Sequence, residues 1–134
     1  MAIFGIGSHF GGIGNVADKF IADGVAGSNW EDWEAPDIHQ IIGSLKVGDI
    51  IFIKSCSASS KSIYVGAIGF IKDTEILTAK QISYFEIGRN ILWKYTGKEF
   101  PIPKPPHGKN NVRSNTIYQE FHPDVQAVIL SKLI

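Results

Sequence analysis

The hydrophobic pattern of this chain is organised around residues 46–54, KVGDIIFIK. The opening Lys-Val-Gly-Asp predicts a tight polar turn, because Gly tolerates unusual backbone angles and Asp can cap the turn. The apolar, β-branched run at 50–53 predicts a short strand that is buried on both faces. A similar run occupies residues 63–71 after a polar loop, so the pair predicts a hairpin through the middle of a β-rich domain.

Apolar positions elsewhere predict three helices and further short strands around this hairpin. Asn15 is the expected N-cap of the first helix and Gly24 its expected stop, while the second helix is expected at residues 37–45. His122 and Pro123 are expected to open the third, with four inward residues: Val125, Val128, Ile129 and Leu130. Strands are expected at residues 2–7, 25–28, towards the end of 86–95 and within 113–121.

The remaining stretches are connections, and the sum of the elements indicates a fold class. Residues 76–85 are ambiguous, whereas the four prolines within 99–111 predict an extended connection over the surface. The elements together predict an α+β fold, a small curled β-sheet or open barrel of about five or six strands with about three peripheral helices. At 134 residues the chain has the length of one domain, which we expect to cover residues 1–134.

The composition indicates the cellular compartment in which the protein is expected. The hydrophobic fraction of 44% is typical of a globular chain, and no apolar run approaches the length that spans a bilayer, so we expect no membrane partner. The single cysteine, Cys56, excludes an internal disulfide and fits a reducing compartment. The start, Met-Ala-Ile-Phe-Gly, lacks the basic region of a signal peptide. We therefore expect a cytoplasmic protein.

The formal net charge is zero, but the charges are unevenly spread. Residues 1–49 carry two basic side chains against seven acidic ones. Residues 89–113 carry one acidic side chain, Glu99, against six basic ones: Arg89, Lys94, Lys98, Lys104, Lys109 and Arg113. The basic segment could contact phosphates in a salt-dependent manner or consist of solvated side chains, and a pI near 6.9 argues against a strong non-specific duplex binder.

Residue motifs for catalysis or cofactor binding are sparse. The glycine-rich residues 8–14 lack the Lys-Ser/Thr of a P-loop. Residues 12–17 fit G-x-G-x-x-A, with Asp32 and Glu34 about 20 residues further on, but the glycines follow the strand too late and the other strands are expected to be antiparallel. The four histidines show no metal-ligand spacing, and a Cys56 nucleophile would need a base that the sequence does not reveal. We therefore predict no catalytic residue, metal or cofactor.

Two tryptophans, Trp30 and Trp33, lie in the acidic loop at 29–36. Aromatic side chains beside small polar residues can stack on a nucleobase. The alternative is that each indole completes the edge of the core. The sequence leaves both interpretations open.

A first strand that ends in Gly-Ile-Gly-Ser leads into residues 18–30, which contain Phe-Ile-Ala-Asp-Gly-Val-Ala and a following Trp. These residues resemble the "Phe-Ile-x-x-Gly-Ile-Ala" helix and following Trp of PUA-like domains of the EVE type. The KVGDIIFIK stretch is similar to the family's most recognisable segment. Further similarity covers the "x-Gly-x-Gly" strand at 65–69, the "Val-x-Trp" strand at 91–95 and the "Arg-x-x-Thr-Ile-Tyr-Glu" run at 113–120. The resemblance spans nearly the whole chain.

This resemblance implies a pseudobarrel with a pocket for a nucleobase, often a modified base that is flipped from DNA or present in RNA. Similar domains precede nucleases and ATPases in modification-dependent restriction systems. Carried over by position, the pocket lining would comprise Ser8, His9, Asn29, Trp30 and Ser55, with Trp33 as a neighbour. Arg113 would meet a phosphate or brace the pocket through an ion pair.

We therefore expect a non-enzymatic module that recognises a base, modified or not, in DNA or RNA. One alternative is a protein that binds or sequesters a free nucleotide or a nucleotide signalling molecule. Another is a small hydrolase or nuclease that uses His9 with Ser8 or Asp32. A third is a protein-interaction adaptor in phage defence or counter-defence, with a vestigial pocket. The expected partners are nucleic acid or a small nucleotide, and a homo-oligomer or a protein partner stays open.

Overall fold

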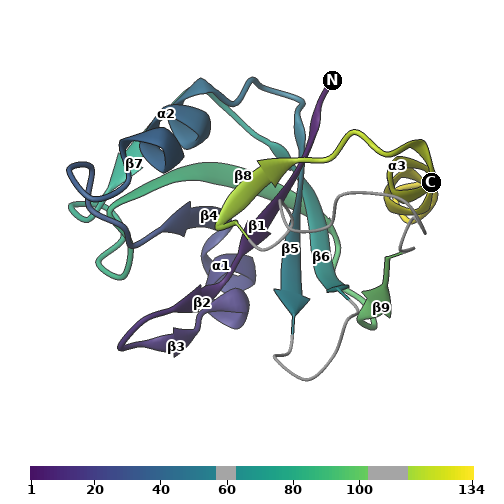
Figure 1. Ribbon diagram of the computed structural model, residues 1–134, viewed down its shortest axis with the longest axis horizontal. Helices are drawn as coiled ribbons and strands as arrows, with labels where there is room; N and C mark the ends of the chain where they lie inside the picture. Colours follow the sequence, from purple (N-terminus) through teal and green to yellow (C-terminus); the bar gives the residue numbers. More distant parts are fainter. Residues whose placement is uncertain (57–62, 103–114) are drawn as a thin grey trace.

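The computed structural model describes residues 1–56, 63–102 and 115–134 of the chain. Within these residues the fold is α+β, and an eight-stranded mixed sheet curls into a half-barrel with three helices around it (Figure 1). The main path of the sheet runs β10–β1–β5–β6–β8–β4, with β7 added to β8 and β9 added to β6. The predicted curled sheet with peripheral helices is confirmed.

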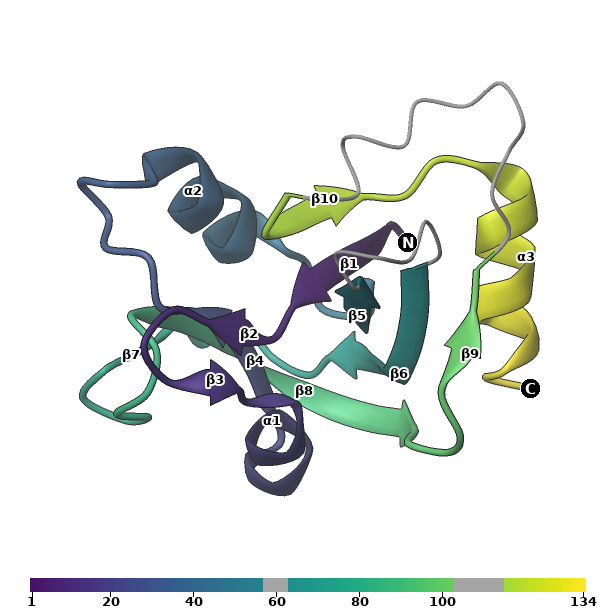
Figure 2. The same ribbon diagram turned by 60° about the horizontal axis from the view of Figure 1, so that its bottom comes forward.

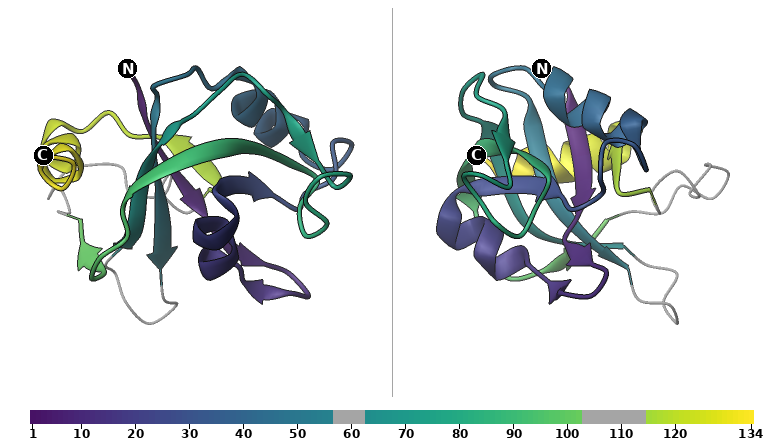
Figure 3. Two further views of the ribbon diagram at one scale, coloured as in Figure 1. Left: turned by 180° about the vertical axis from the view of Figure 1, so that it is seen from behind. Right: turned by 90° about the vertical axis from the view of Figure 1, so that its left-hand side faces the viewer.

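The described residues form three helices, the eight strands of the sheet and a separate hairpin. The helices are α1 (Ala17–Asp23), α2 (Pro36–Ser44) and α3 (Pro123–Ser131). The strands of the sheet are β1 (Ile3–Gly7), β4 (Val25–Ser28), β5 (Ile50–Cys56), β6 (Ile63–Ile71), β7 (Leu77–Thr78), β8 (Ile87–Tyr95), β9 (Phe100–Pro101) and β10 (Ile117–Gln119). A separate two-stranded hairpin, β2 (His9–Phe10) with β3 (Gly14–Asn15), projects from the body beside α1 (Figure 3).

The predicted central hairpin is confirmed, because β5 and β6 pair antiparallel and lie in the middle of the sheet. The expectation that the strands beyond one possible βαβ unit are antiparallel is wrong for β5. β1 pairs with β5 in parallel, from Ile3 opposite Ile50 to Gly7 opposite Lys54. A parallel neighbour requires a long crossover, and the intervening α1, β4 and α2 provide it. The carboxyl ends of β1 and β5 therefore lie side by side.

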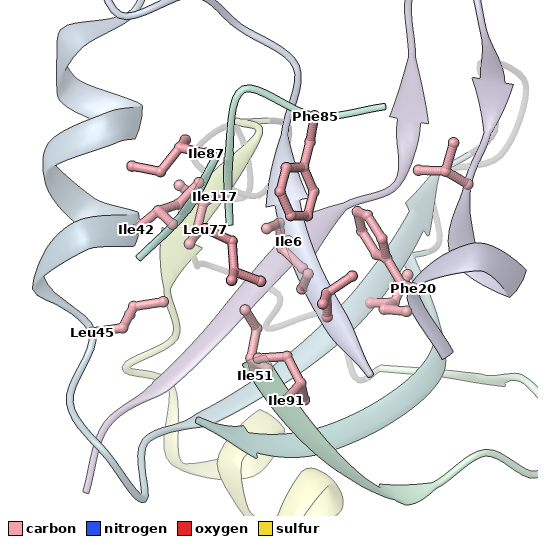
Figure 4. Close-up of a cluster of buried hydrophobic side chains, with 14 of the residues drawn as sticks. Ile6, Phe20, Ile42, Leu45, Ile51, Leu77, Phe85, Ile87, Ile91 and Ile117 are labelled. Atoms are coloured by element: carbon pink, nitrogen blue, oxygen red, sulfur yellow. The ribbon is translucent and has the colours of Figure 1, made fainter. Parts of the chain in front are cut away.

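The two faces of the sheet carry different hydrophobic clusters. Ile51 and Ile53 of β5 belong to the larger cluster, which packs beneath α1 and α2 (Figure 4). Ile50 and Phe52 point the other way, into a smaller cluster with Val125 and Ile129 of α3. Alternating side chains of one strand therefore fill both clusters, as expected for a strand that is buried on both faces. Figure 2 shows α2 and α3 on opposite sides of the sheet.

The turn before β5 is held by the carboxylate of Asp49, as the sequence predicted. Oδ2 accepts from the Lys46 amide at 2.8 Å, and Oδ1 accepts from the Ala2 amide at 3.0 Å. Gly48 adopts φ +89° in this turn, a conformation that favours glycine. Because Ala2 immediately precedes β1, the carboxylate also joins the beginning of β1 to the beginning of β5.

The helix ends differ slightly from the prediction. Gly24 ends α1 in the left-handed conformation, as expected. Asn15 is not the N-cap, because α1 begins at Ala17; its Oδ1 instead accepts from the Ala17 amide at 3.0 Å across Val16. Helix α2 begins one residue early, at Pro36, since proline suits the first helical turn.

Two other predictions are refined at the C-terminal half of the chain. Val128 is half-buried and lies outside the cluster that α3 covers, whereas the other three predicted inward residues belong to it. Within the proline-rich connection, Phe100 and Pro101 form β9. The rest of that connection, from residue 103, lies outside the described residues.

Arg89 is the largest polar side chain in the interior and is only 2% exposed. It lies on β8, and its Nη1 donates to the carbonyls of Ile42 at 3.0 Å and Leu45 at 2.6 Å. Nη2 donates to the Asp73 carbonyl at 2.8 Å. Burial lowers the pKa of Arg89, while the nearby carboxylates of Asp73 and Asp49 act in the opposite direction. This guanidinium ties the end of α2 to the sheet and is not a solvated member of the basic segment.

No helix among the described residues is long and apolar enough to cross a membrane.

Candidate functional site

A pocket of about 480 Å³ opens where β1, β4 and β5 end. This volume lies within the range of roughly 300–1,000 Å³ that small-molecule sites occupy. Its lining comes from the β1 end and the β2–β3 hairpin, the β4 end, the β5 end and the chain before β10: Gly7, Ser8, His9, Phe10, Asn15, Ser28, Asn29, Trp30, Lys54, Ser55, Asn115 and Thr116. We refer to this cavity as the strand-end pocket.

Five of the seven residues predicted from the sequence line the strand-end pocket: Ser8, His9, Asn29, Trp30 and Ser55. They come from segments that are far apart in the chain and that the sheet brings together. Trp33 does not join them, because its side chain is 78% exposed on the outer part of the same loop. Arg113 lies outside the described residues, so its predicted role stays a prediction.

Ser8 is buried, and both its hydroxyl and its carbonyl group are hydrogen-bonded. Its Oγ donates to Asn15 Oδ1 at 2.7 Å, and its carbonyl accepts from the Val16 amide at 2.8 Å. Asn15 Oδ1 also accepts from Ala17, so the orientation of the Asn15 amide is set by two donors. The Ser8–Asn15 pair therefore forms a rigid polar corner of the pocket.

Lys54 lies opposite Gly7 in the β1–β5 pairing, lines the pocket and is only 8% exposed. The β5–β6 register shifts between Ile53 and Lys54, which is a bulge that bends the strand where it reaches the pocket. The Lys54 ammonium donates to the Asn115 carbonyl and lies 5.3 Å from the centre of the Tyr118 ring. Among the described lining residues, Lys54 is the one with a permanent formal charge.

The backbone of Trp30 is held by two side chains. Ser28, fully buried at the end of β4, accepts from the Trp30 amide at 3.2 Å. His39 Nε2 lies 2.6 Å from the Trp30 carbonyl oxygen. A carbonyl can only accept, so Nε2 must carry the proton in this contact. These bonds fix the peptide groups on both sides of Trp30, whose indole remains 46% exposed to the pocket and solvent.

We expect His39→Ala to loosen this loop. Loss of a hydrogen bond worth about 1 kcal/mol should raise the amide exchange rates of Trp30 and Glu34 about fivefold. His39→Gln retains an amide donor and should restore most of the protection. Hydrogen exchange followed by NMR tests this, with the exposed neighbour Gln40→Ala as the matched control. Equal exchange rates in wild-type and His39→Ala proteins would contradict the proposed restraint.

Trp30 also lines two smaller hollows beside the strand-end pocket. One, of about 250 Å³, is lined by His9, Gly11, Asn29, Trp30 and Glu34. The other, of about 430 Å³, extends along α2 and also includes Trp30 and Glu34. Trp30 therefore borders three cavities, and Glu34 lines two of them.

The sequence interpretation missed Lys54, Asn15 and Ser28. Lys54 was visible as the residue that follows the apolar run at 50–53, but the sequence could not reveal that it lines a cavity. Asn15 was assigned to helix capping, which is only one of its two roles. Ser28 offered no signal, because a serine at a strand end is common and its partner is the backbone two residues further along.

Among the described residues, Ser8 and His9 line the same pocket, but no hydrogen bond joins their side chains. The Ser8 hydroxyl donates to Asn15, and Asp32 lines a different hollow of about 500 Å³ with Glu31 and His39. Among the described residues, no group of three or more His, Cys, Asp or Glu is arranged to hold a metal ion. The arrangement is suited to binding a flat, polar ring between an indole and hydrogen-bonding side chains.

The chain matches no protein-family model, no curated protein and no solved structure. The resemblance to PUA-like domains of the EVE type therefore stays a prediction.

Proposed function

We propose that the protein is a non-enzymatic nucleobase-binding module and that the strand-end pocket receives the base. The observation that carries this proposal is the convergence of Trp30 with seven Ser, Thr and Asn side chains that can hydrogen bond: Ser8, Asn15, Ser28, Asn29, Ser55, Asn115 and Thr116. An exposed indole offers a stacking platform, and fixed polar groups can read the edge of the stacked ring.

Charge supports recognition of the base more than of its phosphate. Trp30 is followed by the acidic Glu31, Asp32 and Glu34, and these side chains are exposed. Carboxylates repel phosphate, so a nucleotide would be bound with its phosphate directed away from this loop. The ligand best suited to the pocket is thus a base that projects from a nucleic acid strand.

The proposal is tested by binding titrations at two salt concentrations. Single- and double-stranded oligonucleotides, with and without modified cytosine or adenine, are compared with free nucleotides. We expect oligonucleotide binding that weakens as salt rises, because phosphates outside the pocket contribute through counterion release. Tight binding of free nucleotides alone would favour a nucleotide sensor or a sequestering protein. Absence of binding in both sets would exclude the proposal and favour the protein-interaction adaptor.

A further inference from the structure

We propose that the base bound in the strand-end pocket is guanine, with its donor edge towards Glu34 and its acceptor edge towards Lys54. This inference rests on the proposed function and adds the identity of the base to it. The carboxylate and the ammonium lie in hollows that meet at Trp30. Each attracts a different kind of atom on a ring that stacks against the indole.

The strand-end pocket and the 250 Å³ hollow share lining residues at Trp30. The 250 Å³ hollow that contains Glu34 shares His9, Asn29 and Trp30 with the strand-end pocket, which contains Lys54. Trp30 therefore borders one hollow that contains a carboxylate and one pocket that contains a buried lysine. Among the described lining residues of the two, Glu34 is the one acidic residue and Lys54 the one lysine or arginine.

The Glu34 carboxylate has capacity for a ligand. In the described part of the chain its one hydrogen bond is a long one, 3.4 Å from the Glu31 amide to Oε1. Glu34 is exposed, and it lines both of the smaller hollows that Trp30 also lines. Its oxygens can therefore accept from a pair of adjacent N–H groups without breaking an internal network.

The hydrogen-bond donors and acceptors of each nucleobase determine which base suits a carboxylate and an ammonium group. Guanine carries adjacent donors, N1–H and the N2 amino group, which a carboxylate can accept as a bidentate pair. Its opposite edge carries the acceptors O6 and N7, the atoms that lysine and arginine contact in nucleic acids. Adenine and cytosine place a ring nitrogen with a lone pair beside their amino group, and uracil places carbonyl oxygens on both sides of N3–H. Those lone pairs would face the carboxylate.

The test is a nucleoside titration followed by quenching of tryptophan fluorescence. Guanosine, inosine, adenosine, cytidine and uridine are compared, since inosine differs from guanosine only by loss of the N2 amino group. We expect guanosine to bind most tightly and inosine about tenfold more weakly, because one charge-assisted hydrogen bond is lost. The other three nucleosides should bind more weakly than inosine.

Glu34→Gln identifies the residue responsible. This substitution keeps the shape of the side chain but removes the charge and one acceptor. We expect guanosine affinity to fall about tenfold and the difference between guanosine and inosine to disappear. Asp32→Asn is the matched control, because it removes one charge from the same loop but lies on the 500 Å³ hollow. Its guanosine affinity should stay within about twofold of wild type.

The outcomes separate the inference from the proposed function. Equal affinity for all nucleosides, or oligonucleotide binding without measurable nucleoside binding, would overturn the guanine assignment while nucleobase binding stands. A guanosine preference that survives in Glu34→Gln would overturn the role of Glu34. Failure of every nucleoside and oligonucleotide to bind would overturn both the proposed function and this inference.

Discussion

Replacing Trp30 by Ala should weaken nucleobase binding by about ten- to a hundredfold. Stacking of a base on an aromatic side chain is worth about 1–3 kcal/mol by alanine substitution, and Trp30 is the indole in the described lining of the pocket. The fold should persist, since this side chain is 46% exposed. Binding is measured by calorimetry with the oligonucleotide that wild type binds most tightly, and folding is checked by circular dichroism.

Trp33→Ala is the matched control for this experiment. It removes an indole from the same acidic loop, but the side chain is 78% exposed and is absent from the described lining of the strand-end pocket. We expect less than about a twofold change in affinity, because an exposed side chain away from the ligand contributes little. Equal losses in the two variants would place the ligand outside the pocket. An unchanged affinity in Trp30→Ala would show that the indole does not contribute to binding.

Replacing Arg89 by Met should lower the free energy of unfolding by about 3–5 kcal/mol. The substitution removes three hydrogen bonds from the guanidinium to the carbonyls of Ile42, Leu45 and Asp73. Methionine has a similar length, so the dominant loss is polar: buried carbonyl oxygens are left without these charged donors. Urea unfolding followed by circular dichroism measures the change.

Two companion variants make the Arg89 result interpretable. Lys94→Met changes an exposed cation on the same strand, β8, and should alter stability by less than about 0.5 kcal/mol. Arg89→Lys keeps the charge but lacks the planar fork, so its stability should fall between those of wild type and Arg89→Met. A stability of Arg89→Met equal to that of wild type would show that apolar packing, and not this network, joins α2 to the sheet.

Several features of the fold could be read from short stretches of sequence. The Lys-Val-Gly-Asp turn is such a case, because a glycine at φ +89° and a carboxylate that caps nearby amides are local requirements. The strand at 50–53 is another, since an unbroken apolar run has no solvated face to present. Gly24 likewise ends α1 through its own backbone conformation.

Where the boundary of a helix differs from the predicted one, a contact with a neighbouring element competes with the local preference of the sequence. Asn15 has the composition of an N-cap, but pairing of β3 with β2 holds its backbone in an extended form. Its side chain then reaches the helix amide from one residue further away. The parallel pairing of β1 with β5 was missed for a related reason: strand direction depends on the path of the crossover, which hydrophobicity does not record.

Local residue pattern thus specifies the turns and the buried central hairpin, since each depends on neighbours within a few positions. The predicted residues of the pocket came instead from the resemblance to PUA-like domains. Long-range packing decides which groups each side chain contacts. Arg89 and Lys94 look alike in a count of charges, yet Arg89 meets three carbonyls from two distant segments whereas Lys94 remains exposed. Ser8, Trp30 and Lys54 become one site because the ends of β1, β4 and β5 meet, and sequence spacing carries no information about that distance.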